Sequence, residues 1–157
     1  MNVQNDELIA AIRAMFHDDD RLPAPDAIAV EAFSGDVILR GTVGSLPQAR
    51  AAVNDARRTR GVLNVSNELE VRILKGDRRE DAEIQGAALQ RLIWDPEVPA
   101  DYIDVSVKDG WVTLRGEIDY QFQSDAAFDH VATLRGVTGV TNHLKVTEAL
   151  YRGRSEE

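Results

Sequence analysis

The sequence predicts an α+β protein that consists of two tandem domains with the same order of elements. Its most informative feature is a strand-like motif that occurs twice, as VILRGTV at residues 37–43 and as VTLRGEI at residues 112–118. In each copy, aliphatic residues and a glycine recur at every second position, which is typical of a strand with one buried face. The elements predicted around each motif run helix, strand, strand, helix, strand, so a whole unit is repeated.

Capping and turn residues delimit the elements of the first copy. Asn5 is the predicted N-cap of the first helix, and Ser45, followed by Pro47, is that of the second. Gly61 is the predicted stop signal of the second helix. The tight turn at residues 34–36 joins the first two strands in a β-hairpin. The predicted elements are a helix over 6–16, a strand over 27–33, the repeated strand, a helix over 48–60 and a strand over 62–71.

The second copy repeats this order. Its predicted elements are a helix over 84–93, a strand over 102–107, the repeated strand, a helix over 123–134 and a strand over 137–146. The strands and second helices correspond at an offset of 75 residues, and the first helices align best at an offset of 77, which pairs Ile12 with Leu89 and Phe16 with Ile93. The predicted organisation is a first domain at 1–73, a linker at 74–81, a second domain at 82–148 and a charged tail at 149–157.

Each domain is predicted to form a three-stranded mixed sheet with two helices on one face. The helices bury that face of the sheet, and the other face and the sheet edges are left for partners.

The charge of the chain disfavours several classes of partner. The net charge is −9, with −2 on residues 1–75 and −7 on residues 76–157. This sign disfavours nonspecific nucleic-acid binding and attraction to anionic lipid. We expect no nucleic-acid partner. The chain shows no signal peptide and no apolar run long enough to cross a membrane, so we expect a soluble, cytoplasmic protein.

The repeated pattern resembles the BON domain family. The resemblance rests on Leu-Arg-Gly in the second strand, at residues 39–41 and 114–116, and on Gly-Val-x-x-Val-x-Asn-x-Leu-x-Val at residues 61–71 and 136–146. It covers the chain from about residue 5 to residue 147. The first copy departs from the family at Asn64, where the second copy has the usual glycine, Gly139. We expect Asn64 to preserve a turn, because asparagine tolerates left-handed backbone.

Six positions of this pattern are interpreted as structural. We expect the glycine after Leu-Arg to relieve crowding where a helix packs on the sheet, rather than to admit a ligand. The asparagines are in phase with core valines and leucines. We expect them to be buried and bound to a neighbouring loop backbone, with ligand contact as the alternative. The six residues are Gly41, Gly116, Gly61, Gly136, Asn67 and Asn142.

Four residues are candidates for an interaction face. Arg40 and Arg115 lie on the strand face opposite the predicted core, where they are solvated, form an interface or hold an anion. Trp111 shares the outward face of its strand with Arg115, where an inter-domain, oligomer, ligand or membrane contact covers it or where it is simply partly exposed. Trp94 follows the apolar stripe of its helix and is predicted to cover the core.

The sequence contains no catalytic or metal-binding pattern. His17, His130 and His143 are scattered, the chain has no cysteine, and no serine lies in a nucleophile context. Asp18, Asp19 and Asp20 lack the ligand spacing of a calcium loop and are interpreted as a solvated loop. The arginines at positions 57, 58 and 60 suit the negative end of a helix dipole rather than nucleic acid. We therefore predict no cofactor and no metal site.

The resemblance implies a non-enzymatic protein linked to the cell envelope and to osmotic or general stress. We therefore predict a binding or scaffolding protein with an unknown protein partner or with self-association. One alternative is binding to a phospholipid surface, and a second is cytoplasmic sensing of potassium or another cation. Both follow from the resemblance, because the BON domain family includes proteins with each property.

Overall fold

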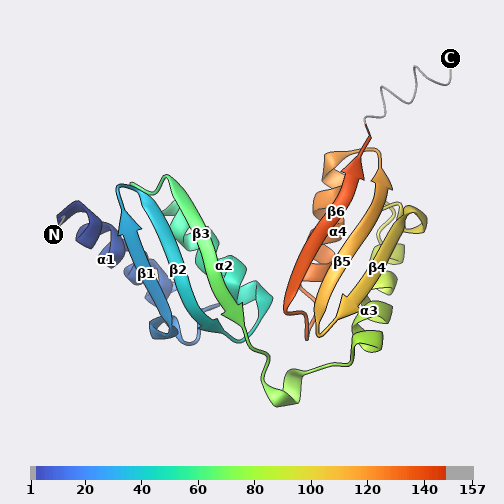
Figure 1. Cartoon of the computed structure of the whole chain (residues 1–157), viewed down its shortest axis with the longest axis horizontal. Helices are drawn as coiled ribbons and strands as arrows, with labels where there is room; N and C mark the ends of the chain where they lie inside the picture. The colour runs from blue at the N-terminus through green and yellow to red at the C-terminus, as the bar shows by residue number, and fades with distance from the viewer. Residues whose placement is uncertain (1–2, 148–157) are drawn as a thin grey trace. The chain divides into compact units, whose positions relative to one another are not determined.

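The computed structural model describes residues 3–147, so the predicted charged tail at 149–157 lies outside the described residues. The chain divides into two compact units, the first ending at Arg72 and the second beginning at Ile73. Figure 1 shows a sheet and two α-helices in each unit. The predicted fold class, α+β with two units of the same architecture, is confirmed.

Each unit contains the five predicted elements and a short 3-10 helix. The first unit comprises α1 (Val3–Asp18), η1 (Pro25–Ala27), β1 (Ile28–Phe33), β2 (Asp36–Val43), α2 (Leu46–Arg58) and β3 (Asn64–Val71). A further 3-10 helix, η2 (Lys75–Asp77), follows. The second unit then comprises α3 (Asp81–Trp94), η3 (Ala100–Tyr102), β4 (Ile103–Lys108), β5 (Trp111–Ile118), α4 (Gln121–Ala132) and β6 (Gly139–Val146).

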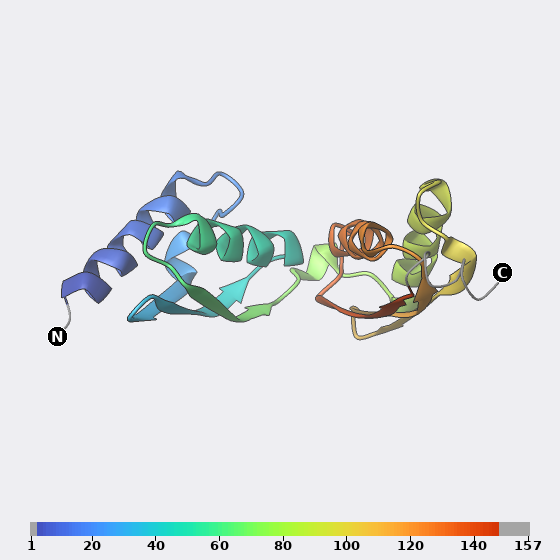
Figure 2. The ribbon, with the colours of Figure 1, turned by 90° about the horizontal axis from the view of Figure 1, so that it is seen from above.

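Both sheets are mixed, with the repeated strand in the middle. The strand order is β1-β2-β3 in one sheet and β4-β5-β6 in the other. The first pair of each sheet is antiparallel and the second pair is parallel. Figure 2 shows both helices of each unit on the same side of its sheet. One sheet face is therefore covered by helices and the other is not.

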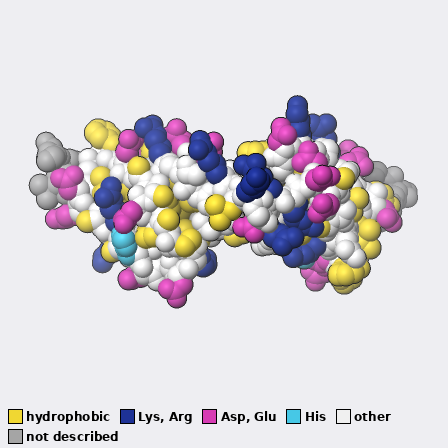
Figure 3. Space-filling view, turned by 90° about the horizontal axis from the view of Figure 1, so that it is seen from below, with side chains coloured by type: hydrophobic (Ala, Val, Ile, Leu, Met, Phe, Trp, Pro, Cys, Tyr) yellow, Lys and Arg dark blue, Asp and Glu magenta, His cyan; other side chains and the backbone are white. Residues whose placement is uncertain are grey.

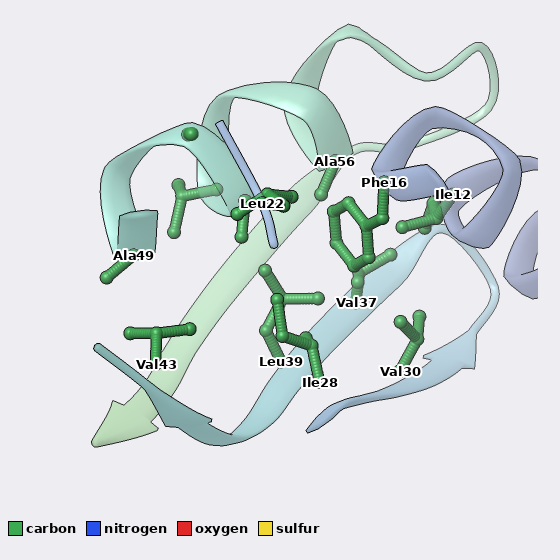
Figure 4. Close-up of a cluster of buried hydrophobic side chains, with 13 residues drawn as sticks. Ile12, Phe16, Leu22, Ile28, Val30, Val37, Leu39, Val43, Ala49 and Ala56 are labelled. Atoms are coloured by element: carbon green, nitrogen blue, oxygen red, sulfur yellow. The ribbon is translucent and has the colours of Figure 1, made fainter. Parts of the chain in front are cut away.

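The core of the first unit lies between its sheet and its two helices. Val37 and Leu39 of β2 point into it, as the alternation predicts, and each is at most 1% exposed. Ile12 and Phe16 of α1 pack against them (Figure 4). In the second unit, the inward residues Val112 and Leu114 of β5 are fully buried in the same way.

The first helices of the two units correspond at an offset of 76 residues, so the predicted offset of 77 is wrong. At the end of α1, Asp19 N–H donates to the Phe16 carbonyl at 3.2 Å. At the end of α3, Asp95 N–H donates to the Leu92 carbonyl in the same way, at 3.3 Å. Leu92 is fully buried, whereas Ile93 is 65% exposed. A shift of one residue rotates a helix by about 100°, so matching the two large side chains placed the wrong face inward.

Asn5 is not an N-cap, because α1 begins at Val3. Its Oδ1 instead accepts a hydrogen bond of 3.0 Å from Ser34 N–H in the hairpin turn. Asp81 does the same in the second unit and accepts from Asp109 N–H at 3.0 Å. Both turn residues have positive φ, 50° at Ser34 and 52° at Asp109, so the first helix of each unit holds a strained turn in place.

Gly41 and Gly116 are required by the close approach of a backbone carbonyl, not by an α-helix that packs on the sheet. Their φ angles are +125° and +142°. A Cβ at Gly41 would collide with the carbonyl oxygen of Ala27, and one at Gly116 with that of Tyr102. In each unit the colliding atom belongs to the 3-10 helix that leads into the first strand, so these glycines let the sheet begin where it does.

The predicted caps of α2 are partly confirmed. Gln48 N–H donates to Ser45 Oγ at 3.3 Å, so Ser45 is the N-cap. The helix ends at Arg58, and Thr59 is its C-cap. The predicted stop signal, Gly61, lies three residues after Arg58. Gly61 has a φ of +99° and turns the chain toward β3.

Candidate interaction faces

The uncovered sheet faces are the candidate sites for partners. The first outer face consists of the odd-numbered residues 29–33 and the even-numbered residues 36–42 and 64–70, which point away from α1 and α2. The second outer face consists of the even-numbered residues 104–108 and the odd-numbered residues 111–117 and 139–145. Arg40 lies at the centre of the first, and Arg115 occupies the equivalent position in the second.

Arg40 is held by carboxylates from both neighbouring strands. Its Nη1 lies 3.2 Å from Glu31 Oε1, and its Nε lies 3.6 Å from Glu68 Oε2. All three side chains are about half exposed, so the pairs contribute little to stability. Their effect is to neutralise Arg40, which leaves the first outer face acidic.

Arg115 has different surroundings. Its cross-strand neighbours are Asp104 on β4 and His143 on β6, and His143 replaces the glutamate that pairs with Arg40. Within residues 3–147, the side chain of Arg115 has no hydrogen bond or ion pair. Its exposed guanidinium therefore keeps its donors for a partner.

Trp111 lies on the same outer face, at the start of β5. The side chain is 49% exposed, and its Nε1–H donates to Thr141 Oγ1 at 2.7 Å. The indole covers Gly139, where a Cβ would collide with the ring. In the first unit the equivalent residues are Asp36 and Asn64, whose side chains share a 2.9 Å hydrogen bond.

This pairing corrects the interpretation of Asn64. Asn64 is the first residue of β3, and it has no positive φ. The glycine at position 139 makes room for an indole ring, and asparagine is compatible with position 64 because an aspartate faces it there. The difference between the copies is therefore one of side-chain packing across two strands, not of turn conformation.

The two outer faces carry opposite charge. On the first, Glu31, Asp36, Glu68 and Glu70 surround one arginine. On the second, Lys108, Arg115 and Lys145 outnumber Asp104 and Glu117. Figure 3, which views the strands roughly end-on rather than onto the outer faces, shows Lys and Arg together with Asp and Glu side chains on the visible side of the second unit. The second outer face is thus locally basic although residues 76–157 are acidic in total.

Two shallow hollows mark the second outer face. One, of about 480 Å³, lies beside Trp111 and is also lined by Ser106 and Lys108. The other, of about 700 Å³, is lined by Arg115, His143 and other residues of β5 and β6. Both offer donors next to apolar surface, a combination that suits a binding face.

The four candidate interaction residues do not form one site. Trp111 and Arg115 share the second outer face, and Arg40 belongs to the first unit. Trp94 ends α3 in the helical layer and is 73% exposed, so the prediction that it covers the core is wrong. The buried stripe of α3 is formed by Ile84, Ala88 and Leu92, and Trp94 lies beyond it.

Asn67 and Asn142 protect the edge of the third strand, and the prediction that they are buried is wrong. Both are exposed. Asn67 Oδ1 accepts from Leu69 N–H and Asn142 Oδ1 from Leu144 N–H, each at 3.0 Å. Because Arg72 N–H donates toward β2 and donors alternate along a strand, the Leu69 N–H points to the open edge. The asparagines thus occupy donors that would otherwise pair with another chain.

In each unit a polar contact joins the second helix to the segment just after the first helix, and its partners are distant in the sequence. Asp55 of α2 is 1% exposed, and its Oδ1 accepts from Arg58 at 2.8 Å and from Arg21 at 3.4 Å. Burial and the neighbouring Asp19 raise the pKa of Asp55. The hydrogen bond from Arg21 holds the pKa of Asp19 well below its usual range.

The second unit makes the equivalent contact with a histidine. His130 occupies the position of Asp55, and its Nε2 lies 2.7 Å from Asp95 Oδ2. This hydrogen bond, with one from Glu97 N–H, lowers the pKa of Asp95. In both units an aspartate after the first helix meets a titratable residue of the second helix, so the contact recurs with the fold.

Within residues 3–147, no group of three or more His, Asp and Glu side chains is arranged to hold a metal ion. Of the three consecutive aspartates, Asp19 is engaged by Arg21 at 2.7 Å. Over the same residues, no helix is both long and apolar enough to cross a membrane.

The comparisons with known proteins identify the class. The model of the BON domain family matches the chain twice, over residues 4–73 and 80–148. The chain therefore belongs to the BON domain family and carries the domain in tandem. It is 35% identical over 153 residues to the osmotically-inducible protein Y of Escherichia coli (strain K12), a match that covers 92% of this chain and 74% of that protein.

Two further similarities are more distant. The chain is 31% identical over 124 residues to the 21 kDa hemolysin of Actinobacillus pleuropneumoniae, covering 78% of this chain and 63% of the hemolysin. Among solved structures, CdsD, a structural protein of the type III secretion system of Chlamydia trachomatis, matches with a TM-score of 0.41 and 12% identity, over 96% of this chain and 67% of that one. A similarity at this level says nothing about function.

Proposed function

We propose that this chain is a non-catalytic binding or scaffolding protein of the osmotic or general stress response, and that it binds an acidic protein surface through its second outer face. The observation that carries the proposal is that the half-exposed Trp111 and the unpaired Arg115 lie on the same sheet face, which no helix covers. The similarity to the osmotically-inducible protein Y supports the link to stress.

The chemistry of this face favours a protein partner. Tryptophan and arginine are the residues most enriched among those that dominate binding energy at protein interfaces. The basic side chains of Lys108, Arg115 and Lys145 complement a carboxylate-rich surface, and this opposite charge raises the rate at which the two proteins associate. The first outer face of a second copy is one surface with that charge, so self-association is one form of the proposal.

A capture experiment with matched variants tests the proposal. The full chain is immobilised as wild type, as Trp111→Ala, as Lys145→Glu and as Trp94→Ala, and incubated with extract from cells grown at high osmolarity. We expect Trp111→Ala and Lys145→Glu to lose a specific polypeptide, or self-association, that Trp94→Ala retains. The same variants are tested for restoring growth of a deletion strain at high osmolarity. Equal capture and equal restoration by all variants would contradict the proposal.

The same face supports one second candidate, a phospholipid surface. Basic side chains beside an amphipathic indole suit the boundary of an anionic membrane. Asp104 and Glu117 on the same face oppose this attraction, which is why a protein partner ranks first. Co-sedimentation with phosphatidylglycerol and phosphatidylcholine vesicles distinguishes the two. Binding to the anionic vesicles at physiological salt, lost in Lys145→Glu, would reverse the ranking.

A further inference from the structure

The two units differ at one groove, which the second unit fills with its own arginine. Arg79, in the segment before α3, lays its side chain over Gly136, where a Cβ would lie 3.2 Å from the arginine Cβ and Cγ. Its Nη1 donates to the carbonyl oxygen of Arg135 at 3.3 Å. Its Nε lies 3.8 Å from Glu83 Oε2, and only 20% of the side chain is exposed.

The first unit has the same acceptors at the equivalent positions. With offsets of 76 in the first helix and 75 elsewhere, Glu83 corresponds to Glu7, Gly136 to Gly61, and the Arg135 carbonyl to that of Arg60. These three residues line an open groove of about 510 Å³ between α1, the hairpin turn and the loop before β3. Leu8 and Leu63 add apolar walls.

The burial of the groove residues shows that, among the described side chains, none fills the groove of the first unit as Arg79 fills that of the second. Gly136 is buried, whereas Gly61 is exposed. Ile84 is fully buried, whereas its counterpart Leu8 is only half-buried. Leu63 is 75% exposed at the rim of the groove.

The backbone explains why the first unit does not fill its own groove. The chain before α3 is extended, with φ −71° and ψ 150° at Glu80, and this brings Arg79 across the groove. The residue equivalent to Arg79 is Val3, where α1 is already helical. In the first unit, therefore, α1 already includes the position whose equivalent in the second unit, Arg79, lies across Gly136.

We propose that this groove of the first unit binds an arginine side chain presented by an extended segment of a partner protein. The Arg60 carbonyl would accept a hydrogen bond from one guanidinium and the Glu7 carboxylate would form an ion pair with it, as the Arg135 carbonyl and the Glu83 carboxylate do with Arg79. The flat backbone of Gly61 and the side chain of Leu63 would cover the aliphatic stem. A lysine has a single point charge and cannot reproduce both contacts. The site is separate from the second outer face, so it goes beyond the function proposed above.

The Arg60 side chain does not preclude such a ligand. The equivalent residue of the second unit is also an arginine, Arg135, and its carbonyl accepts from Arg79 there. In the first unit Glu7 is exposed and, within residues 3–147, its side chain has neither a hydrogen bond nor an ion pair.

The test is a titration of the isotope-labelled full chain, followed by its amide NMR spectrum. The probe is a blocked peptide with the sequence of residues 76–80, which contains the arginine that fills the second groove. Two control peptides carry lysine or alanine in place of its last arginine. We expect shifts at the amides of Gly35, Gly61 and Leu63, weaker with the lysine peptide and absent with the alanine peptide.

A matched pair of variants tests the charged contact. Glu7→Gln removes the groove carboxylate, and Asp6→Asn removes the neighbouring charge of the same helix, which does not line the groove. We expect Glu7→Gln to weaken binding about two- to five-fold, the range of an exposed ion pair, and Asp6→Asn to have no effect. Equal shifts with the alanine peptide, or no shifts at about 5 mM peptide, would overturn the proposal.

Discussion

Two glycines of the second unit, Gly86 and Gly116, should respond to alanine in opposite directions. Gly86 lies in the middle of α3, and a Cβ there would meet nothing within 4 Å. Alanine removes the helix penalty of glycine, which is about 0.8–1 kcal/mol. For a unit of this size, that gain corresponds to a rise in melting temperature of roughly 3–8 °C.

Gly116→Ala should destabilise the same unit severely. Its φ of +142° lies in a region that is essentially restricted to glycine, and the new methyl group would overlap the Tyr102 carbonyl. Backbone strain alone costs about 1–3 kcal/mol, so with the collision we expect a loss of at least about 3 kcal/mol.

Tryptophan fluorescence separates this unit from the rest of the chain. The chain has 2 tryptophans, Trp94 and Trp111, and both belong to the second unit. Urea unfolding of the full chain, followed by this signal, gives the free energy of unfolding for each variant. A loss of stability in Gly86→Ala would contradict the helix assignment. If Gly116→Ala lowered the free energy of unfolding by no more than Gly86→Ala changes it, the close approach of the Tyr102 carbonyl to Gly116 would be contradicted.

Two further predictions concern the polar contacts. Because the His130 hydrogen bond lowers the pKa of Asp95 in the folded state, its stabilisation is present above the unfolded value of 3.8 and is lost as the pH falls through the folded value. His130→Ala should therefore flatten the acid side of the stability profile of the second unit below about pH 4, and an unchanged profile would contradict the contact. Asn142→Ala should lower the free energy of unfolding by about 1–3 kcal/mol and promote aggregation. The substitution leaves the Leu144 N–H at the sheet edge without its acceptor, and it removes the Nδ2 that donates to the buried Ser124 hydroxyl at 2.8 Å. Asn67→Ala should lower the free energy of unfolding by less, because Ala49 occupies the position equivalent to Ser124. Melting followed by circular dichroism and by light scattering measures both variants. An equal loss of stability in the two variants would contradict this account.

The strands could be predicted from sequence because their signal is local. A period of two assigns Val37, Leu39 and Val43 to one face whatever lies above them, and the structure places all three in the core. The first helices were harder because α3 is apolar on several sides. Ala88 and Leu92 form its buried stripe, but the larger Leu89 and Ile93 lie beside them and led to the wrong offset. Side-chain size was a poor guide because close packing against the sheet favours a small residue at position 88.

The polar contacts could not be predicted because their partners are distant in the sequence. Asp55 meets Arg21 across 34 residues, and nothing near it distinguishes it from a solvated helix carboxylate. Asn5 looked like an N-cap because the same side chain that caps a helix also caps a turn, and only the fold brings Ser34 next to it.

The comparison of the two units separates residues that maintain the fold from residues that are free to differ. Contacts that fix the fold recur in both units: the Asn5 and Asp81 clamps on the hairpin turn, and the glycines against the η1 and η3 carbonyls. The outward positions are not held in this way, and surface substitutions there have little effect on stability. Charge at these positions is reversed between the units, so stability does not determine it. The specificity of each unit should therefore reside in its outer face and in the groove beside its first helix, where the lengths of α1 and α3 differ.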